Sequence, residues 1–107
     1  MQLGTVAGRQ VRVRFDRTLR AERTIFAAKV RAARALLGLS QEEMADRIGL
    51  TQKSVHRIEQ GLVEPKVRTV FAIEQFWARC GLVFEDQEDG GFRLAVAGSI
   101  LGQRADT

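Results

Sequence analysis

Side chains that donate and accept hydrogen bonds are concentrated in residues 51–61, which read TQKSVHRIEQG. Only Val55 and Ile58 in this stretch are strongly apolar, whereas a helix in a small protein ordinarily buries a wider apolar stripe. Amide, ammonium, imidazole and guanidinium groups are those that pair with base edges and phosphates. The stretch is therefore expected to form a short helix whose polar side is presented to a ligand.

Catalytic chemistry finds little support elsewhere in the chain. His56 and Cys80 are the single histidine and the single cysteine, and they cannot make a structural zinc site unless several acids join them. The sequence contains no phosphate-binding glycine loop, no nucleophile elbow and no HExxH motif. The acidic groups at 42–46 and 85–89 are expected to be solvated charges on a helix and in a turn. We expect no enzyme, no cofactor and no metal.

The charge distribution favours a polyanionic partner. The 107 residues, enough for one domain, carry a net charge of +4 and give a pI of about 10.2. Residues 1–35 carry nine basic and two acidic side chains, whereas residues 36–81 are balanced and residues 82–107 are acidic. Nucleic acid is therefore the first candidate partner.

Compartment is inferred from what the sequence lacks. No apolar run approaches the roughly 20 residues of a membrane span, and the start of the chain has no secretory pattern. One cysteine cannot form an internal disulfide, which suits a reducing compartment. We expect a cytoplasmic protein associated with the nucleoid and no membrane partner.

Three helices are predicted from periodicity and capping signals. Apolar residues at i, i+4, i+7 and i+11 indicate a first helix over 22–37, ended by Gly38. Ser40 with Glu43 forms a capping box for a second helix that stops at Gly49. Thr51 then caps the helix TQKSVHRIEQ, which ends at Gly61.

A fourth helix and a hairpin complete the predicted core. Pro65 suits the first turn of a helix that runs to Gly81. Its expected inward residues are Val67, Val70, Phe71, Ile73, Phe76, Trp77 and Cys80, with the cysteine as a small buried hydrophobe. The strand-like runs at 82–85 and 92–96 flank the turn-rich DQEDGG and predict a β-hairpin.

The N-terminal region allows several interpretations. In QVRVRF, apolar and basic residues alternate with the period of a strand, although a disordered basic leader is an equal alternative. A third interpretation is a basic arm that follows the minor groove or the DNA backbone. Its candidate contacts are Arg9, Arg12, Arg14, Arg17 and Arg20.

The region between the second and third helices has the helix-turn-helix pattern. In SQEEMADRIGLTQKSVHRIEQG, small Ala45 allows two helices to cross closely and Gly49 permits a positive φ in the turn. Leu50, Val55 and Ile58 would fix the crossing angle. A helix held by so few apolar residues is free to project the others into a major groove.

The stretch RAARALLGLSQEEMADRIGLTQKSVHRIEQG resembles the phage-repressor and Cro-like helix-turn-helix proteins, called the XRE family. The resemblance implies a mainly α fold: a four-to-five-helix lambda-repressor-like domain, with a C-terminal β-hairpin and a candidate N-terminal strand. It divides the chain into an arm or strand (1–20), the DNA-binding domain (21–81), a hairpin (82–97) and a flexible tail (98–107). The arm is not part of the family's common core.

The same resemblance implies roles for individual residues. Gln52 would read adenine through a bidentate amide pair, and the base-reading set would be Gln52, Lys53, His56 and Arg57. Phosphates would be held by Gln41, Thr51, Ser54, Lys66 and Arg68, assisted by helix N-termini. Lys53, His56 and Arg57 could instead be plain surface residues. Glu59 is expected to pair internally, with Arg47 as the candidate partner.

Function and assembly follow as expectations. We expect a transcription regulator of bacterial or phage type that binds double-stranded DNA, more specifically a repressor or autoregulator. One recognition helix contacts few bases, so a homodimer on an inverted repeat is expected. The hairpin and the QVRVRF strand are the candidate dimerisation elements. The rival hypothesis is an antitoxin or adaptor whose surface binds a partner protein.

Overall fold

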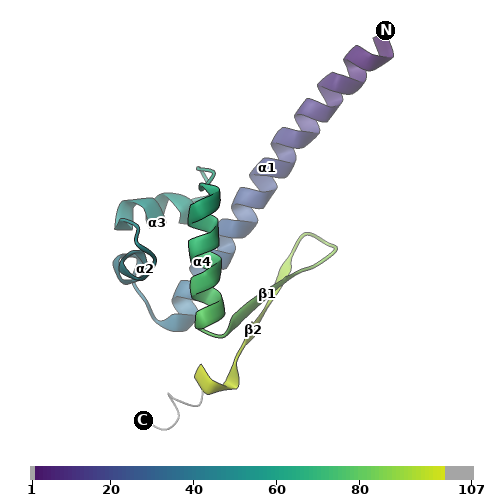
Figure 1. Cartoon of the computed structure of the whole chain (residues 1–107). Helices are drawn as coiled ribbons and strands as arrows, with labels where there is room; N and C mark the ends of the chain where they lie inside the picture. Colours follow the sequence, from purple (N-terminus) through teal and green to yellow (C-terminus); the bar gives the residue numbers. More distant parts are fainter. Residues whose placement is uncertain (1, 101–107) are drawn as a thin grey trace.

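The computed structural model describes residues 2–100, with side chains from Arg20 onward. Four helices precede a two-stranded antiparallel hairpin (Figure 1). Their bounds are α1 Gln2–Leu37, α2 Gln41–Ile48, α3 Gln52–Glu59, α4 Val67–Arg79, β1 Leu82–Asp86 and β2 Phe92–Val96. The mainly α fold with a C-terminal hairpin is confirmed.

The first helix corrects the prediction for the N-terminal region. QVRVRF lies inside α1, which is continuous over 36 residues, so the predicted N-terminal strand is wrong. Alternation over six residues is a weak signal, and no proline interrupts the helical pattern that begins at 22–37. The first half of α1 projects away from the other elements (Figure 1), which makes the molecule 68 Å long.

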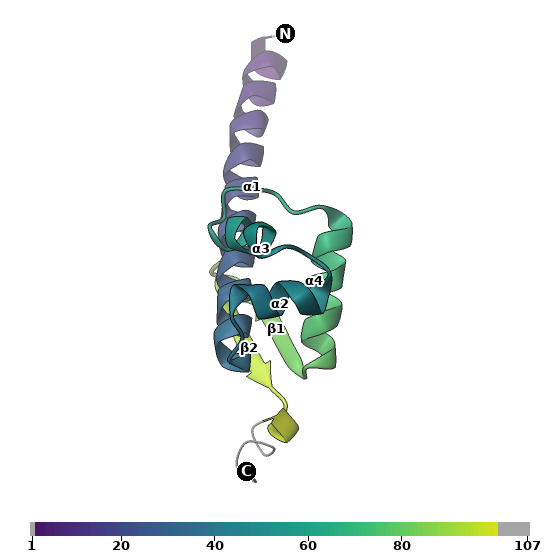
Figure 2. The same cartoon turned by 90° about the vertical axis from the view of Figure 1, so that its left-hand side faces the viewer.

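The core lies between the second half of α1 and helices α2 to α4. Fully buried Val30, Met44, Val55 and Ile73 come one from each helix. Viewed from the side of α2 and α3 (Figure 2), these two short helices lie across α1 and α4. Phe76 and Trp77 are buried as expected. Cys80 at the end of α4 is half-buried.

Helix α4 departs from the predicted burial at its start. Val67 and Phe71 were expected to face inward but are 87% and 62% exposed. Both precede the point where α4 meets the core, because its buried residues Ile73, Phe76 and Trp77 all lie in its second half. Pro65 lies outside the helix, before the N-cap Lys66.

Strands β1 and β2 pair as the predicted hairpin. Leu82 opposes Val96 and Phe84 opposes Leu94, so these side chains share one face of the ladder and pack on the core. Aromatic rings continue from helix to hairpin, with Trp77 and Phe84 centroids 4.5 Å apart. The hairpin is therefore anchored to α4 by one of its faces.

A glycine and an ion pair fix the hairpin's position. Gly81, between α4 and β1, has φ +76°, and a Cβ there would lie 2.8 Å from that of Ala97. At the far end of the hairpin, Lys29 of α1 lies 2.7 Å from the carboxylate of Asp86. Residues 98–100, assigned to a flexible tail, begin a helical turn, and the rest of that tail lies outside the described residues.

None of the helices formed by residues 2–100 combines the length and apolar content needed to cross a bilayer.

Candidate nucleic-acid interface

The first helix of the motif starts at a complete capping box. The side chain of Ser40 accepts a hydrogen bond from the backbone N–H of Glu43, and Glu43 Oε1 accepts one from the N–H of Ser40, both at 3.0 Å. The hydrogen bond from the N–H of Ser40 to the Glu43 carboxylate, with a further contribution from the Ser40 hydroxyl, lowers the pKa of Glu43 below its ordinary value of 4.5. The cap fixes where α2 begins.

The turn between α2 and α3 depends on a left-handed glycine. Gly49 has φ 74° and ψ 29°, and the N–H of Leu50 donates to the carbonyl of Ala45 at 2.9 Å. Thr51 then caps α3, because its hydroxyl oxygen accepts from the N–H of Ser54 at 3.1 Å. The chain thus turns from one helix into the next within three residues, as the sequence predicts.

Helix α3 is held to the domain by its apolar residues and one acid. Val55, Ile58 and Glu59 are buried, with exposed fractions of 1%, 5% and 5%. They occupy one side of a helix of eight residues. The remaining positions are free to face outward.

All four predicted base-reading residues are on the exposed part of α3. They are Gln52, Lys53, His56 and Arg57. Spacings of one, three and four residues on a helix place such side chains over one continuous surface. The structure therefore brings the four together, as expected of a surface that reads a groove.

Gln41 connects the two helices of the motif. Gln52 Nε2 lies 2.7 Å from Gln41 Oε1, and Gln41 Nε2 lies 3.2 Å from Glu59 Oε1. The same Gln41 nitrogen is 3.5 Å from His56 Nδ1. The half-buried Gln41 side chain is thus engaged by α3, beyond its predicted role as a phosphate contact.

The partner of Glu59 differs from the predicted one. Arg34 of α1, not Arg47, forms the ion pair, with Nε 2.7 Å from Oε2 and Nη2 2.9 Å from Oε1. The guanidinium of Arg31 also donates to the backbone carbonyl of Glu59. The hydrogen bond to Glu59 raises the pKa of Arg34, against the opposing effect of burial. Helix α1 therefore holds α3 through two arginines.

Sequence reasoning missed Arg34 because its contact spans 25 residues along the chain. Helical spacing reports only neighbours within one helix. The available signal was Glu59 itself: an acid between buried positions needs a cation, and Arg34 lies on the helix that the core pattern places nearby. From the sequence, Glu59 can be seen to need a cationic partner, but several arginines remain candidates for that partner.

The predicted phosphate contacts fall into two groups. Thr51 and Ser54 are used as caps, and the Thr51 hydroxyl donates to Ser54 Oγ at 2.9 Å. Lys66 and Arg68 are exposed at the start of α4. Exposed Arg20 and the other candidate arm arginines, 9 to 17, all belong to α1. Phosphate binding by these residues stays a prediction.

Comparisons with known proteins agree with this geometry. A family model described as helix-turn-helix matches residues 30–76, from the second half of α1 to the middle of α4. The chain is 33% identical over 58 residues to an uncharacterized HTH-type transcriptional regulator of Methanocaldococcus jannaschii, which covers 54% of this chain and 83% of the relative. A second such regulator, from Archaeoglobus fulgidus, is 32% identical over 63 residues, which cover 56% of this chain and 90% of the relative.

Both of these relatives are archaeal, whereas the sequence pattern suggested a bacterial or phage origin. The motif is therefore shared beyond the group from which its name derives. The family match begins at Val30 and ends at Phe76, so the projecting part of α1 and the hairpin lie outside it.

Proposed function

The chain belongs to the helix-turn-helix transcription regulators of the phage-repressor and Cro-like type, and from this premise we propose that α3 reads the major groove of a specific operator. DNA binding in transcription regulation is the function that the family supports. The finer parts of the proposal are a repressor or autoregulator, a homodimer and an inverted repeat.

One observation carries this proposal. The outward side of α3 bears four exposed side chains, Gln52, Lys53, His56 and Arg57, whose chemistry matches base edges. Gln52 is oriented by its hydrogen bond to Gln41. Arginine or lysine suits guanine O6 and N7, and a glutamine amide suits adenine N6 and N7.

A dimer follows from the amount of DNA that one helix can contact. A single recognition helix reaches three or four base pairs, whereas paired half-sites about 34 Å apart double the specific contacts. A repressor needs no further domain, because occupancy of an operator excludes other proteins from it. Regulation would then depend on protein level, on a partner or on proteolysis.

The test is genome-wide occupancy of the wild-type chain compared with a Gln52→Ala, Lys53→Ala, Arg57→Ala triple variant. A matched control replaces three exposed hairpin residues, Glu85, Glu88 and Arg93, by alanine. The proposal expects sharp peaks with a two-fold motif in wild type and in the control, and their loss in the α3 variant. Diffuse occupancy in all three chains would refute sequence reading by this helix.

An antitoxin or adaptor role is the second candidate, and the apolar exposure on α4 favours it. Val67 and Phe71 are large apolar side chains left in solvent on one helix. Co-expression with the product of the neighbouring gene separates the candidates. A stoichiometric complex that is lost in Phe71→Ser would favour the antitoxin, whereas its absence would favour an independent regulator.

A further inference from the structure

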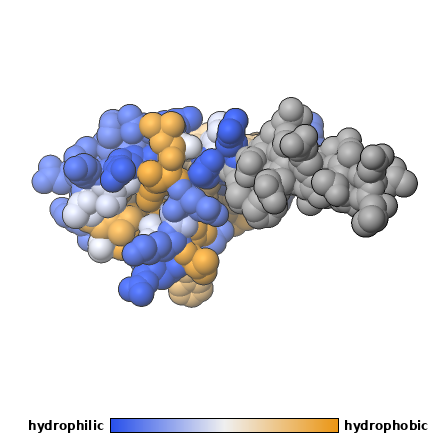
Figure 3. Space-filling view, turned by 90° about the horizontal axis from the view of Figure 1, so that it is seen from above, coloured by the Kyte–Doolittle hydropathy of each residue, from blue (hydrophilic) through white to orange (hydrophobic). Residues whose placement is uncertain are grey.

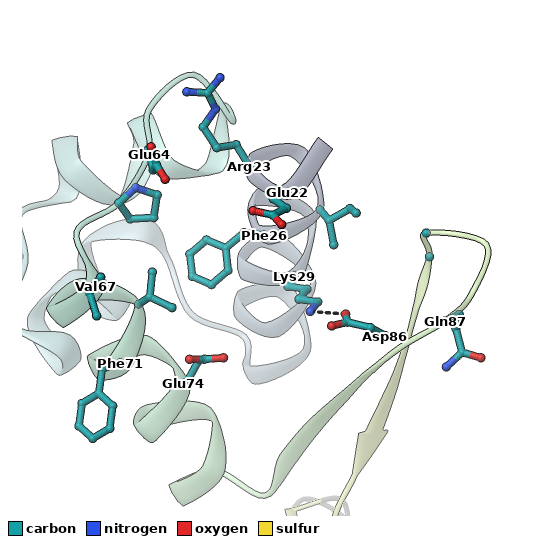
Figure 4. Close-up of a pocket in the computed structure, with 15 residues that line it drawn as sticks. Glu22, Arg23, Phe26, Lys29, Glu64, Val67, Phe71, Glu74, Asp86 and Gln87 are labelled. Atoms are coloured by element: carbon teal, nitrogen blue, oxygen red, sulfur yellow. Dashed lines mark hydrogen bonds and ion pairs between the residues drawn. The ribbon is translucent and has the colours of Figure 1, made fainter. Parts of the chain in front are cut away.

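A groove lies between α1, the start of α4 and the tip of the hairpin, on a different part of the surface from the outward residues of α3. Its volume is about 600 Å³, and it contains Phe26 from α1, Pro65 and Val70 near the start of α4, and Gly91 from the hairpin tip (Figure 4). Seen from the end where α4 begins (Figure 3), apolar side chains reach the surface among hydrophilic ones. Nothing in the proposed DNA-reading role uses this groove.

The wall formed by α4 is apolar where it meets solvent. Val67 and Phe71 lie four residues apart and hence on the same side of the helix, and both line the groove. An exposed phenylalanine and valine on one helix face, beside a groove, are typical of a surface that packs against another apolar surface. The occupant therefore needs an apolar stripe.

The groove is also acidic. Glu22, Glu64 and Glu74 line it, and within residues 20–100 none of them has an ion pair. A fourth acid, Asp86, is neutralised by Lys29. Arg23 is the remaining cation, and its buried Nε has no hydrogen-bond partner among the described residues. The occupant that fits these charges is cationic overall.

One segment of this chain has both properties. Residues 2–19 contain four arginines and one aspartate, and they lie on the part of α1 that projects from the body. The same stretch carries apolar residues at a regular spacing of four, Leu3, Ala7, Val11 and Phe15. A helical segment that is basic overall and also carries apolar residues is the kind of partner that an acidic groove with an apolar wall fits.

We propose that the groove receives residues 2–19 of α1 from a second copy of the chain. The same segment cannot reach its own groove, because α1 is one continuous helix that leads away from the body (Figures 1 and 2). The exchange is reciprocal: each copy fills the groove of the other, so the interface is two-fold symmetric. This inference rests on the proposed function, because it supplies the surface for the proposed homodimer.

It also replaces the dimerisation surface suggested by the sequence. A strand at QVRVRF would have extended the hairpin, but those residues are helical. The hairpin remains as the competing surface, and Val83 of β1 is 55% exposed on the face opposite Leu82 and Phe84. The two surfaces predict different sensitive residues.

The first experiment measures the oligomeric state of the full chain by sedimentation equilibrium. Phe71→Ser is compared with Leu62→Ser, because Leu62 is also an exposed apolar residue, at 74%, but does not line the groove. Phe71→Ser should raise the dimer dissociation constant by at least about tenfold, and Leu62→Ser should leave it unchanged. A wild-type monomer, or equal effects of both substitutions, would overturn the proposal.

The second experiment reverses charges on each side separately. One chain carries Glu22→Arg and Glu74→Arg in the groove, and the other carries Arg12→Glu and Arg14→Glu in the helix. Each chain alone should stay monomeric because like charges face one another, and an equimolar mixture should form a heterodimer. Failure of the mixture to associate, when wild type does, would overturn the proposal.

Two controls distinguish this inference from the proposed function. Binding to a single half-site is measured for Phe71→Ser and for the α3 triple alanine variant. Loss only in the α3 variant supports DNA reading whatever the dimer surface is. Dimer loss in Val83→Lys but not in Phe71→Ser would assign the interface to the outer face of the hairpin and overturn the groove proposal alone.

Discussion

Helices α3 and α4 expose opposite kinds of surface. Helix α3 buries its apolar residues Val55 and Ile58 and leaves polar side chains outside, whereas α4 buries Ile73 and Trp77 and still exposes Val67 and Phe71. A polar outward surface remains solvated until a polar ligand replaces the water. An apolar surface exposed to water is unfavourable in free energy, and a protein partner that covers the surface removes this penalty. The two helices therefore point to different classes of partner.

The helices also differ in what holds them in place. Helix α4 is anchored by large apolar side chains. The ring centroid of Trp77 lies 5.8 Å from that of Phe26 and 4.5 Å from that of Phe84. Helix α3 is anchored by two aliphatic residues, Val55 and Ile58, together with the pair of Glu59 and Arg34. Bidentate hydrogen bonds between charged groups add a directional constraint that apolar contacts alone do not supply. That distinction suits the role proposed for α3, in which the helix is held in one orientation against a groove.

The largest expected effect is on the anchor of α4. Trp77→Ala should lower the free energy of unfolding by about 3 to 5 kcal/mol, because it removes a large buried side chain between α1 and the hairpin. Chemical denaturation measures the change. Trp77→Phe is the control, and its cost should be much smaller because the buried Trp77 Nε1 has no hydrogen-bond partner in residues 20–100. Equal costs would show that the ring area is not what stabilises α4.

The anchor of α3 should respond in a different way. Arg34→Met should cost about 3 kcal/mol of stability, since it leaves the buried Glu59 carboxylate without its cation. Adding Glu59→Met should restore most of that stability, because no charge then remains buried. DNA binding should not recover with it, since Gln41 loses its acceptor. Recovery of both folding stability and DNA binding in the double variant would show that the charge pair has no part in orienting α3.

A smaller effect is expected on DNA binding. Gln52→Ala should weaken operator binding by about 1 to 3 kcal/mol, measured by fluorescence anisotropy at fixed salt, with no change in the salt dependence. An exposed residue of the hairpin, Glu88, serves as the control through Glu88→Ala. A loss that is the same on operator and on unrelated DNA would contradict base reading by Gln52.

The smallest effect concerns the cap of α2. Ser40→Ala should cost about 1 kcal/mol at neutral pH. The lowered pKa of Glu43 means that its contribution is fully present above its ordinary value of 4.5 and is lost as pH falls through the lower folded value. Glu43→Gln should therefore flatten the acid side of the stability profile in thermal melts. A profile identical to wild type would exclude ionised Glu43 as part of the cap.

Local signals account for the parts of the fold that could be predicted. Ser40, Gly49 and Thr51 act on neighbouring residues, so the bounds of α2 and α3 follow from the sequence. The face of β2 that packs on the core follows from the alternation of Phe92, Leu94 and Val96 with other residues. The exposure of the base-reading set followed in the same way, since only two apolar positions were available to anchor α3.

Features that depend on distant neighbours were missed. Val67 and Phe71 continue the apolar pattern of α4. They are nevertheless exposed, because α1 and the hairpin cover only the second half of this helix. QVRVRF has the alternation of a strand but no strand beside it to pair with. The partner of Glu59 required knowing which arginine the crossing of α1 and α3 brings near. The sequence pattern identifies the apolar face of a helix or strand, but the packing of distant elements determines which part of that face is buried.

The hydrogen bond between Gln41 and Glu59 determines how the side-chain amides of Gln41 and Gln52 are oriented. A carboxylate paired with a guanidinium only accepts hydrogen bonds, so Gln41 must turn its NH₂ inward and its carbonyl oxygen toward Gln52. Gln52 must then donate, which leaves its own carbonyl oxygen and one N–H unused. One acceptor beside one donor is the complement of the adenine edge. In the proposed base-reading role, the hydrogen bonds that run from Glu59 through Gln41 therefore orient Gln52 and leave it the acceptor and the donor that adenine requires.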